Sequence, residues 1–492
     1  MPYTRTPRER RNVLHRIPER PAGDVWGLPP AQELRSLVLR PGSAVSARPS
    51  EQRPRRTCNP FAEGESVSCG ICRREMYIWS VTDRWTHGAT VARYGPVSCG
   101  MAGGVGKRRS SSGMTSKERV YATLEGRIPD RVPIGEFAID FDTVEKILGH
   151  ETYLRAKAKS QIAFWEGRHD EVAQSYLEDH IALHEKLDLD IVTFPMATWE
   201  IPPESDDPPP RRINENTWED KYGRVYKFSE ITHDITCVHD PVEEQRRYTI
   251  EEFRLPPPPV QRDPRSWAIL DGVIQRFKGR KFICGPSGGE IGIVLLGGME
   301  RGLIRLLEEP EVVKAATPFF LQLQNAADAV LIHPDCDAVL WAADFGHKTG
   351  PFISPQMFRE FFLEANRERV RNIRSRFRKR VAKHCCGRIE ALLDFFLEIG
   401  YDVYQSIQPS AGMDLCLLKR RIGDRITLWG GVSVENLVSG SPEDVRHDVR
   451  RAMACAKEGG RFILGSSHSI AVGTKYENFM AMLDEYHRLC WY

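Results

Sequence analysis

Residues 380–409 read RVAKHCCGRIEALLDFFLEIGYDVYQSIQP. The two ends of this stretch, residues 380–386 and 403–409, are short β-rich runs of strand length. Between them lies an amphipathic segment that ends at Gly400, a residue type that commonly stops a helix. The stretch therefore predicts a strand, a helix and a second strand, which is the repeating unit of parallel α/β proteins.

The same alternation runs through residues 114–492. One further example is the helical segment that begins with a Ser441 cap and ends at Gly459. Eight strands, each followed by a helix, indicate an α/β fold of the (β/α)8 TIM barrel class. An open doubly wound sheet is the alternative, but no GxGxxG follows the first strand. The predicted strands are residues 132–137, 190–195, 281–286, 338–344, 380–386, 403–409, 426–431 and 461–467.

An insertion is expected between the second and third strands, at about residues 196–280. A minimal barrel needs about 250 residues, and the excess of this chain is concentrated there. Proline-rich stretches flank residues 222–237, whose apolar pattern predicts a β-hairpin. An insertion on this loop would overhang the barrel mouth, either as a cap over an active site or as a surface decoration.

Charge divides the chain into two parts. The first 113 residues contain 18 Arg and one Lys against nine acidic residues, and they are rich in Pro, Gly and Ser. Such a composition predicts a disordered basic extension, with a mitochondrial transit segment or non-native sequence upstream of the true start as alternatives. Cys69 and Cys72 form a CxxC there, but no second CxxC supports a zinc knuckle. We therefore place the folded domain at residues 114–492.

Composition excludes several classes of protein. The net charge of +2 argues against a nucleic-acid-binding surface, and no stretch approaches the roughly 20 apolar residues of a membrane helix. The cysteines of the folded domain lie in scattered apolar contexts, which indicates reduced thiols, no disulfides and a cytoplasmic protein.

The ends of the strands carry the residues with metal-binding chemistry. In a barrel of this class the active site lies at the C-terminal ends of the strands. His384 and Cys386 are two residues apart on one strand, so both point to the same side, whereas Cys385 points to the other. His468 follows the eighth strand, which lies across the barrel from the fifth. These three residues predict a catalytic zinc site with an open fourth position.

Two carboxylates and two glycines are further candidates. Asp344, after the fourth strand, and Glu290, in the loop after the third, could orient a ligand histidine or donate a proton as catalytic residues. Asp344 could instead cap the turn before the next helix. Gly430 and Gly431 follow the seventh strand, where a cofactor or phosphate could approach the backbone closely.

Several segments resemble the uroporphyrinogen decarboxylase superfamily. The resemblance spans residues 114–492 and is carried by MTSKERVYATLEGRIPDRVPI, GPFISPQMFREFF, WGGVSVENL, GGRFILGSSHSI and YENFMAM. It implies a (β/α)8 barrel with one of two activities. The first is decarboxylation in tetrapyrrole synthesis, and the second is zinc-dependent methyl transfer that serves corrinoid proteins.

The site pattern is closer to the methyltransferase branch. The resemblance implies that His384, Cys386 and His468 hold zinc, which would bind a small thiol as the partner of methylcobalamin, free or on a corrinoid protein. His468 stands where related enzymes often have Cys, so a substrate-binding role for this histidine is the alternative. The first loop, GEFAIDFDTVEKILG, lacks the arginines with which the decarboxylases bind carboxylates. Decarboxylation and a non-catalytic partner of a corrinoid protein remain the alternatives.

Overall fold

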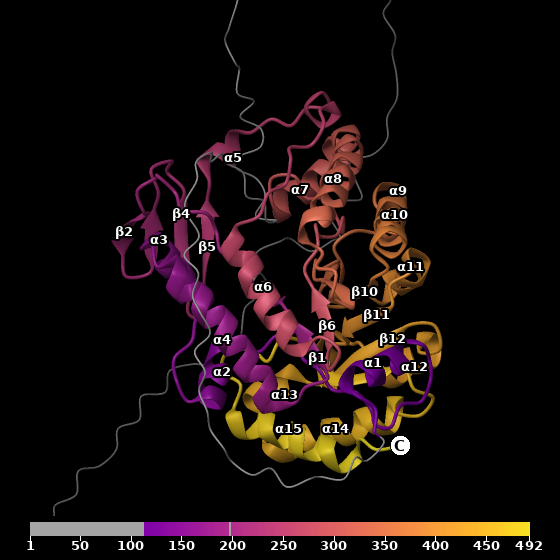
Figure 1. The fold of residues 1–492 in the computed structure, drawn as a ribbon. Helices are drawn as coiled ribbons and strands as arrows, with labels where there is room; N and C mark the ends of the chain where they lie inside the picture. The colour runs from indigo at the N-terminus through magenta and orange to yellow at the C-terminus, as the bar shows by residue number, and fades with distance from the viewer. Residues whose placement is uncertain (1–112, 196–197) are drawn as a thin grey trace, which may run out of the picture. The chain divides into compact units, whose positions relative to one another are not determined.

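The computed structural model describes residues 113–195 and 198–492, so the basic extension and its CxxC lie outside the described residues. Seven of the eight predicted strands form one parallel sheet in the order β1-β6-β7-β10-β11-β12-β13 (Figure 1). These strands are β1 (Ile191–Thr193), β6 (Phe282–Gly285), β7 (Ala338–Trp341), β10 (Arg380–Cys385), β11 (Val403–Ser406), β12 (Thr427–Val432) and β13 (Phe462–Ser466).

The remaining predicted strand, residues 132–137, joins the two ends of this sheet. Ile134 forms a parallel bridge with Leu464 of β13, and its carbonyl accepts a hydrogen bond of 2.8 Å from Asp190 N, just before β1. Pro133 has no backbone N–H, so the ladder does not extend before this bridge, and after it Ser466 N donates to the Glu136 side chain instead. The segment nevertheless lies between β13 and β1, as the (β/α)8 prediction requires, and the predicted fold class is confirmed.

Helices connect successive strands around the barrel, and α1 precedes them. Thr115 and Glu118 form a capping box at the start of α1. Every helix within residues 113–195 and 198–492 is too short or too polar to cross a bilayer. The helices are α1 (Ser116–Leu124), α2 (Phe141–Leu148), α3 (Lys157–Trp165), α4 (His169–Leu187), α5 (Pro241–Gln245), α6 (Pro264–Phe277), α7 (Met299–Glu308), α8 (Pro310–Leu331), α9 (Pro355–Phe361), α10 (Leu363–Asn372), α11 (Leu393–Ile399), α12 (Leu415–Ile422), α13 (Val434–Ser439), α14 (Pro442–Ala456) and α15 (Tyr476–Leu489).

The N-terminal end of the barrel is closed by α1. Val120 and Leu124 of this helix pack against apolar side chains near the starts of the strands. The remaining interior cavity there has a volume of only about 10 Å³. Chemistry is therefore left to the opposite, C-terminal end. The strand residues in this inner core are Ile191, Phe282, Cys284, Ala338, Ala382, Val403, Trp429 and Ile463.

The insertion after β1 forms an antiparallel sheet in the order β2-β3-β4-β5. The predicted hairpin corresponds to β4 and β5, and two further strands extend it. The turn of this hairpin contacts the first turn of α3, because Ala158 N donates to His233 O at 3.2 Å. The insertion therefore packs beside α3 (Figure 1). Its strands are β2 (Arg211–Asn214), β3 (Thr217–Glu219), β4 (Val225–Ser229) and β5 (Asp234–His239).

One pair of cysteines departs from the expectation of reduced thiols. Cys416 of α12 and Cys455 of α14 form a disulfide, with Cα atoms 4.9 Å apart. The expectation of no disulfides is therefore wrong for this pair. The two residues are 39 positions apart and become neighbours because their helices pack side by side on the outside of the barrel.

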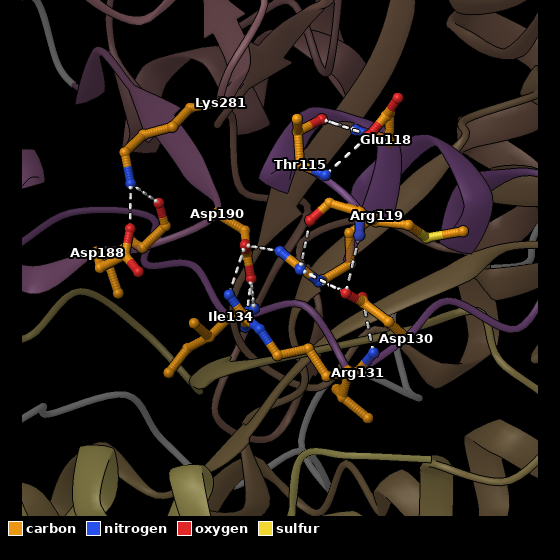
Figure 2. A network of polar contacts seen from close by, with 12 residues as sticks. Thr115, Glu118, Arg119, Asp130, Arg131, Ile134, Asp188, Asp190 and Lys281 are labelled. Carbon is orange, nitrogen blue, oxygen red and sulfur yellow. Dashed lines mark hydrogen bonds and ion pairs between the residues drawn. The ribbon is translucent and has the colours of Figure 1, made fainter. Parts of the chain in front are cut away.

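A buried ion network anchors the first strand segment (Figure 2). Asp190 is fully buried and accepts hydrogen bonds from Arg119 Nη1 at 2.7 Å, Arg131 Nη1 at 2.9 Å and Ile134 N at 2.9 Å. Arg119 also pairs with Asp130 at 2.7 Å. The network joins α1, the residues just before Ile134 and the start of β1. It therefore holds residues 132–137, the segment that closes the barrel, against the sheet.

We expect Asp190→Asn to lower the free energy of unfolding by about 3 kcal/mol, because removal of one partner leaves buried charges without compensation. Asp188→Asn is the matched control. Its carboxylate pairs with Lys281 at 3.1 Å, but the Asp188 side chain is 79% exposed, so little change is expected. Denaturant unfolding curves measure both. Equal effects of the two substitutions would contradict a special role of the Asp190 network.

Candidate metal centre

The side chains of β10 alternate between the two faces of the sheet, as the sequence predicts. His384 points into the barrel, where Phe137 stacks on its ring with centroids 4.1 Å apart. Cys385 belongs to the outer core, and its Sγ accepts a hydrogen bond of 3.3 Å from Phe345 N. Cys386 follows the end of β10 and turns back to the side of His384. Neighbouring cysteines thus have different surroundings.

His468 meets this pair from the other side of the barrel mouth. It lies two residues beyond the end of β13. The candidate ligand atoms of His384, Cys386 and His468 all lie within 4.8 Å of one another. The two imidazole rings face each other edge to face, with centroids 5.7 Å apart. The structure therefore brings together all three predicted ligand residues at the C-terminal end of the barrel.

Gln405 orients His384. The two residues are register partners on β11 and β10, and Gln405 Oε1 accepts a hydrogen bond from His384 Nδ1. This contact assigns the imidazole proton to Nδ1 and leaves Nε2 with a lone pair for a metal ion. Gln405 Nε2 donates to the carbonyl of Ser466 at 3.3 Å, so the same side chain also contacts the segment that leads to His468.

Burial determines the protonation of the cluster. It lowers the pKa of His384 to about 4 and also lowers the pKa of His468, so both imidazoles are neutral near pH 7. Burial, together with the nearby Asp344 carboxylate, raises the pKa of the Cys386 thiol. Neutral imidazoles are ready to bind a cation, whereas the thiol would lose its proton only when a cation compensates the charge.

Asp344 supports the cluster through the backbone. Its Oδ1 accepts a hydrogen bond of 2.9 Å from Cys386 N. The alternative capping role belongs to another residue, because Ser354 caps α9 by accepting from Met357 N at 3.1 Å. Asp344 thus fixes the turn that presents the thiol and places a negative charge beside the three candidate ligands.

Part of the chain resembles a known protein family. Residues 293–489 match the family model described as uroporphyrinogen decarboxylase (URO-D). This part of the chain is similar to that family. The superfamily resemblance predicted from the sequence is therefore confirmed. A comparison with curated proteins finds no match.

Solved structures are similar to this chain at low sequence identity. A methyltransferase from Methanosarcina mazei is 16% identical, covers 76% of this chain and 98% of its own, and superposes with a TM-score of 0.53. A B12-independent methionine synthase from Shewanella sp. W3-18-1 is 11% identical over 64% of this chain and 85% of its own, with a TM-score of 0.29. The first likeness supports the fold, and we draw no argument from the second.

Glu290 lies away from the three candidate ligands. Its Oε1 pairs with Lys383 Nζ at 2.7 Å and accepts a hydrogen bond from Ala343 N at 2.6 Å. Lys383 precedes His384 on β10 and therefore points to the outer face of the sheet. The structure does not bring Glu290 to the His384–Cys386–His468 cluster. Its hydrogen bond with Ala343 N instead joins the loop after β6 to the loop after β7.

Gly430 and Gly431 have tight packing in this structure. A Cβ atom on Gly430 would lie 2.4 Å from Ser406 O on the neighbouring strand. A Cβ atom on Gly431 would lie 2.7 Å from Ala452 Cβ of α14, and its φ of +115° favours glycine. Close packing of β12 accounts for both glycines, and their predicted cofactor-binding role stays a prediction.

Gln405 and Glu136 are two further residues near the cluster that were not predicted from the sequence. Glu136 is the one charged residue of the predicted strand 132–137, and this is the signal that could have revealed it. Gln405 is one of several polar residues in its strand, so its sequence carries no such signal. Glu136 is 3% exposed and accepts hydrogen bonds from Ser466. It lines an internal cavity of about 20 Å³ beside His180 and Thr198, enough for about one water molecule.

Glu136 should give the protein a distinctive pH dependence. Burial raises the pKa of its carboxyl from 4.5 to about 8. Between these pH values the folded chain holds a proton that the unfolded chain has lost, so rising pH destabilises the fold through this window. Glu136→Gln removes the ionisation. We expect the variant to gain unfolding free energy relative to the natural chain as pH rises from 4.5 to 8, with no further gain above it. Urea unfolding at several pH values measures this difference, and a pH-independent difference would contradict a raised pKa.

Proposed function

We propose that the protein transfers a methyl group between a corrinoid and a small thiol, at a zinc ion held by His384, Cys386 and His468. The observation that carries this proposal is the approach of these three ligand atoms to within 4.8 Å at the C-terminal end of the barrel. The URO-D family match and the fold shared with a methyltransferase are consistent with an enzyme of this kind.

The donor set fits zinc. Two imidazole nitrogens and one thiolate sulfur are preferred zinc ligands, and three protein ligands leave a fourth position for a substrate. The low pKa of His384, about 4, keeps its imidazole neutral for binding. When bound, zinc would hold a substrate thiol as its thiolate near neutral pH, where a free thiol with a pKa of about 8.5 is mostly protonated.

The chain's own residues prepare the site. Phe137 and Gln405 fix the plane and the tautomer of the His384 ring. Asp344 fixes the backbone at Cys386 and adds negative charge next to the ligands. A fixed ligand set spends little free energy on reorganisation when the ion or the substrate binds.

The positions of arginines near the mouth argue against decarboxylation of a polycarboxylated tetrapyrrole. Such a substrate needs several cationic partners. Arg155, which affects the pKa of His468, is buried and paired with Asp140 at 2.6 Å. Arg211 lies in β2 of the insertion, where it forms an exposed pair with Glu219 at 2.9 Å. The buried Arg155 guanidinium is therefore already engaged with a carboxylate, and the first loop supplies no arginine. A corrinoid protein is accordingly the partner that we propose as methyl donor or acceptor.

Metal binding gives the first test of the proposed function. The purified protein should contain about one zinc ion per chain. Cys386→Ala should abolish binding, because it removes a ligand, whereas Cys385→Ala should retain it, because this thiol lies on the outer face. His468→Ala should weaken binding. Metal analysis by mass spectrometry and zinc titration measure these effects.

The two cysteine variants control each other, since they remove the same chemical group at adjacent positions. Cys385→Ala creates a cavity in the outer core, so a modest drop in melting temperature with full zinc content is expected. Zinc retained in Cys386→Ala, or lost equally in both variants, would contradict the proposed ligand set.

The reaction itself gives the second test. The zinc-loaded protein should accelerate the loss of methyl from methylcobalamin in the presence of a small thiol, and Cys386→Ala should return the rate to that of thiol alone. The cobalamin spectrum follows the transfer. Uroporphyrinogen under reducing conditions is the competing substrate, and we expect no release of carbon dioxide from it.

The outcomes separate the alternatives. Release of carbon dioxide at a rate unaffected by Cys386→Ala would support the decarboxylase instead. A zinc-loaded protein that binds a corrinoid but leaves methyl groups untouched with every thiol tested would indicate a non-catalytic binding partner.

A further inference from the structure

Glu136 is a buried carboxyl at the seam where the barrel closes. It belongs to the segment between β13 and β1 and is 3% exposed. Both of its oxygens accept from Ser466 N at 3.1 Å, and Oε2 also contacts the Ser466 hydroxyl. Glu136 therefore meets the last residue of β13, two positions before His468.

The Ser466 hydroxyl contacts two oxygens. One is Glu136 Oε2 and the other is the backbone carbonyl oxygen of His468. A hydroxyl carries a single proton, and a carbonyl oxygen can only accept. If the Ser466 proton is donated to His468 O, the contact with Glu136 is a hydrogen bond only when the carboxyl supplies the second proton. Both contacts are hydrogen bonds when the Glu136 carboxyl donates to Ser466 Oγ and the Ser466 hydroxyl donates to His468 O.

We propose that Glu136, as a neutral carboxyl, is a positioning residue that holds His468 in place through the Ser466 hydroxyl. This inference rests on the proposed function in one respect, which is that His468 is a metal ligand. The contact fixes the carbonyl of His468 and so restrains the backbone from which the imidazole projects toward His384 and Cys386.

The other side of the same turn is held by β11. Gln405 Nε2 donates to Ser466 O at 3.3 Å, and Ser406 Oγ donates to Ser467 O at 2.6 Å. These bonds restrain residues 466 and 467, whereas the Glu136–Ser466 pair reaches the carbonyl of residue 468. Loss of Glu136 would therefore release the histidine more than the strand that precedes it.

The test compares three variants by cobalt binding. Glu136→Gln keeps an acceptor for Ser466 N and a donor for Ser466 Oγ, so it should bind Co²⁺ like the natural chain. Glu136→Ala and Ser466→Ala remove the link and should each weaken Co²⁺ binding by about tenfold or more, the usual effect of losing an outer contact to a metal ligand. The double variant should bind no more weakly than either single variant. Cobalt absorption bands report both affinity and coordination.

Asp448→Ala is the matched control, because Asp448 is also buried and accepts from a serine backbone N–H, that of Ser433, at 3.0 Å. It should lower the melting temperature without changing the cobalt spectrum. A second measurement does not depend on metal. In EDTA-treated protein, diethyl pyrocarbonate should modify His468 several-fold faster in Glu136→Ala than in Glu136→Gln or the natural chain, as counted by peptide mass spectrometry.

Two results would overturn the proposal. One is equal cobalt affinity and equal His468 reactivity in Glu136→Ala and the natural chain. The other is a loss in Glu136→Gln as large as that in Glu136→Ala. If the natural chain binds no cobalt, the proposed metal centre fails, and the His468 modification rates alone then decide the role of Glu136.

Discussion

Closure of the barrel depends on residues 132–137, which must join β13 to β1. Pro133 removes a backbone donor, and the segment pairs through an isolated bridge from Ile134 to Leu464. Side-chain contacts therefore hold this segment in place, whereas continuous ladders of backbone hydrogen bonds hold the other strands of the sheet. Asp190 binds the start of the segment and Glu136 binds its end to β13, so two buried carboxyls hold the seam.

These two carboxyls differ in charge because their surroundings differ. Asp190 lies at the closed end of the barrel, where Arg119 and Arg131 compensate its charge. Glu136 receives hydrogen bonds from Ser466, and burial raises its pKa to about 8. A neutral carboxyl can brace the mouth by hydrogen bonding without placing another anion near the candidate ligands. The structure thus uses ionic contacts for stability at one end and neutral contacts near the site at the other.

The sequence predicted those features that follow from local pattern and strand order. The eight-strand count and the alternation of His384, Cys385 and Cys386 are local, and barrel topology then brings β13 opposite β10. It could not predict that Glu290 pairs with Lys383, since this depends on how the loop after β6 folds against β10. The link from Glu136 to Ser466 spans 330 positions, and no pattern within either strand encodes such a contact.

The candidate ligands also depend unequally on the fold. His384 and Cys386 come from one strand end and remain neighbours wherever β10 forms. His468 joins them only when the seam beside β13 is closed. The closing segment contributes on both of its faces, with Phe137 stacked on His384 and Glu136 bound to the turn before His468. A chain with an open seam would therefore keep two of the candidate ligands together and lose the third, so closure of the barrel and assembly of the cluster are a single structural event.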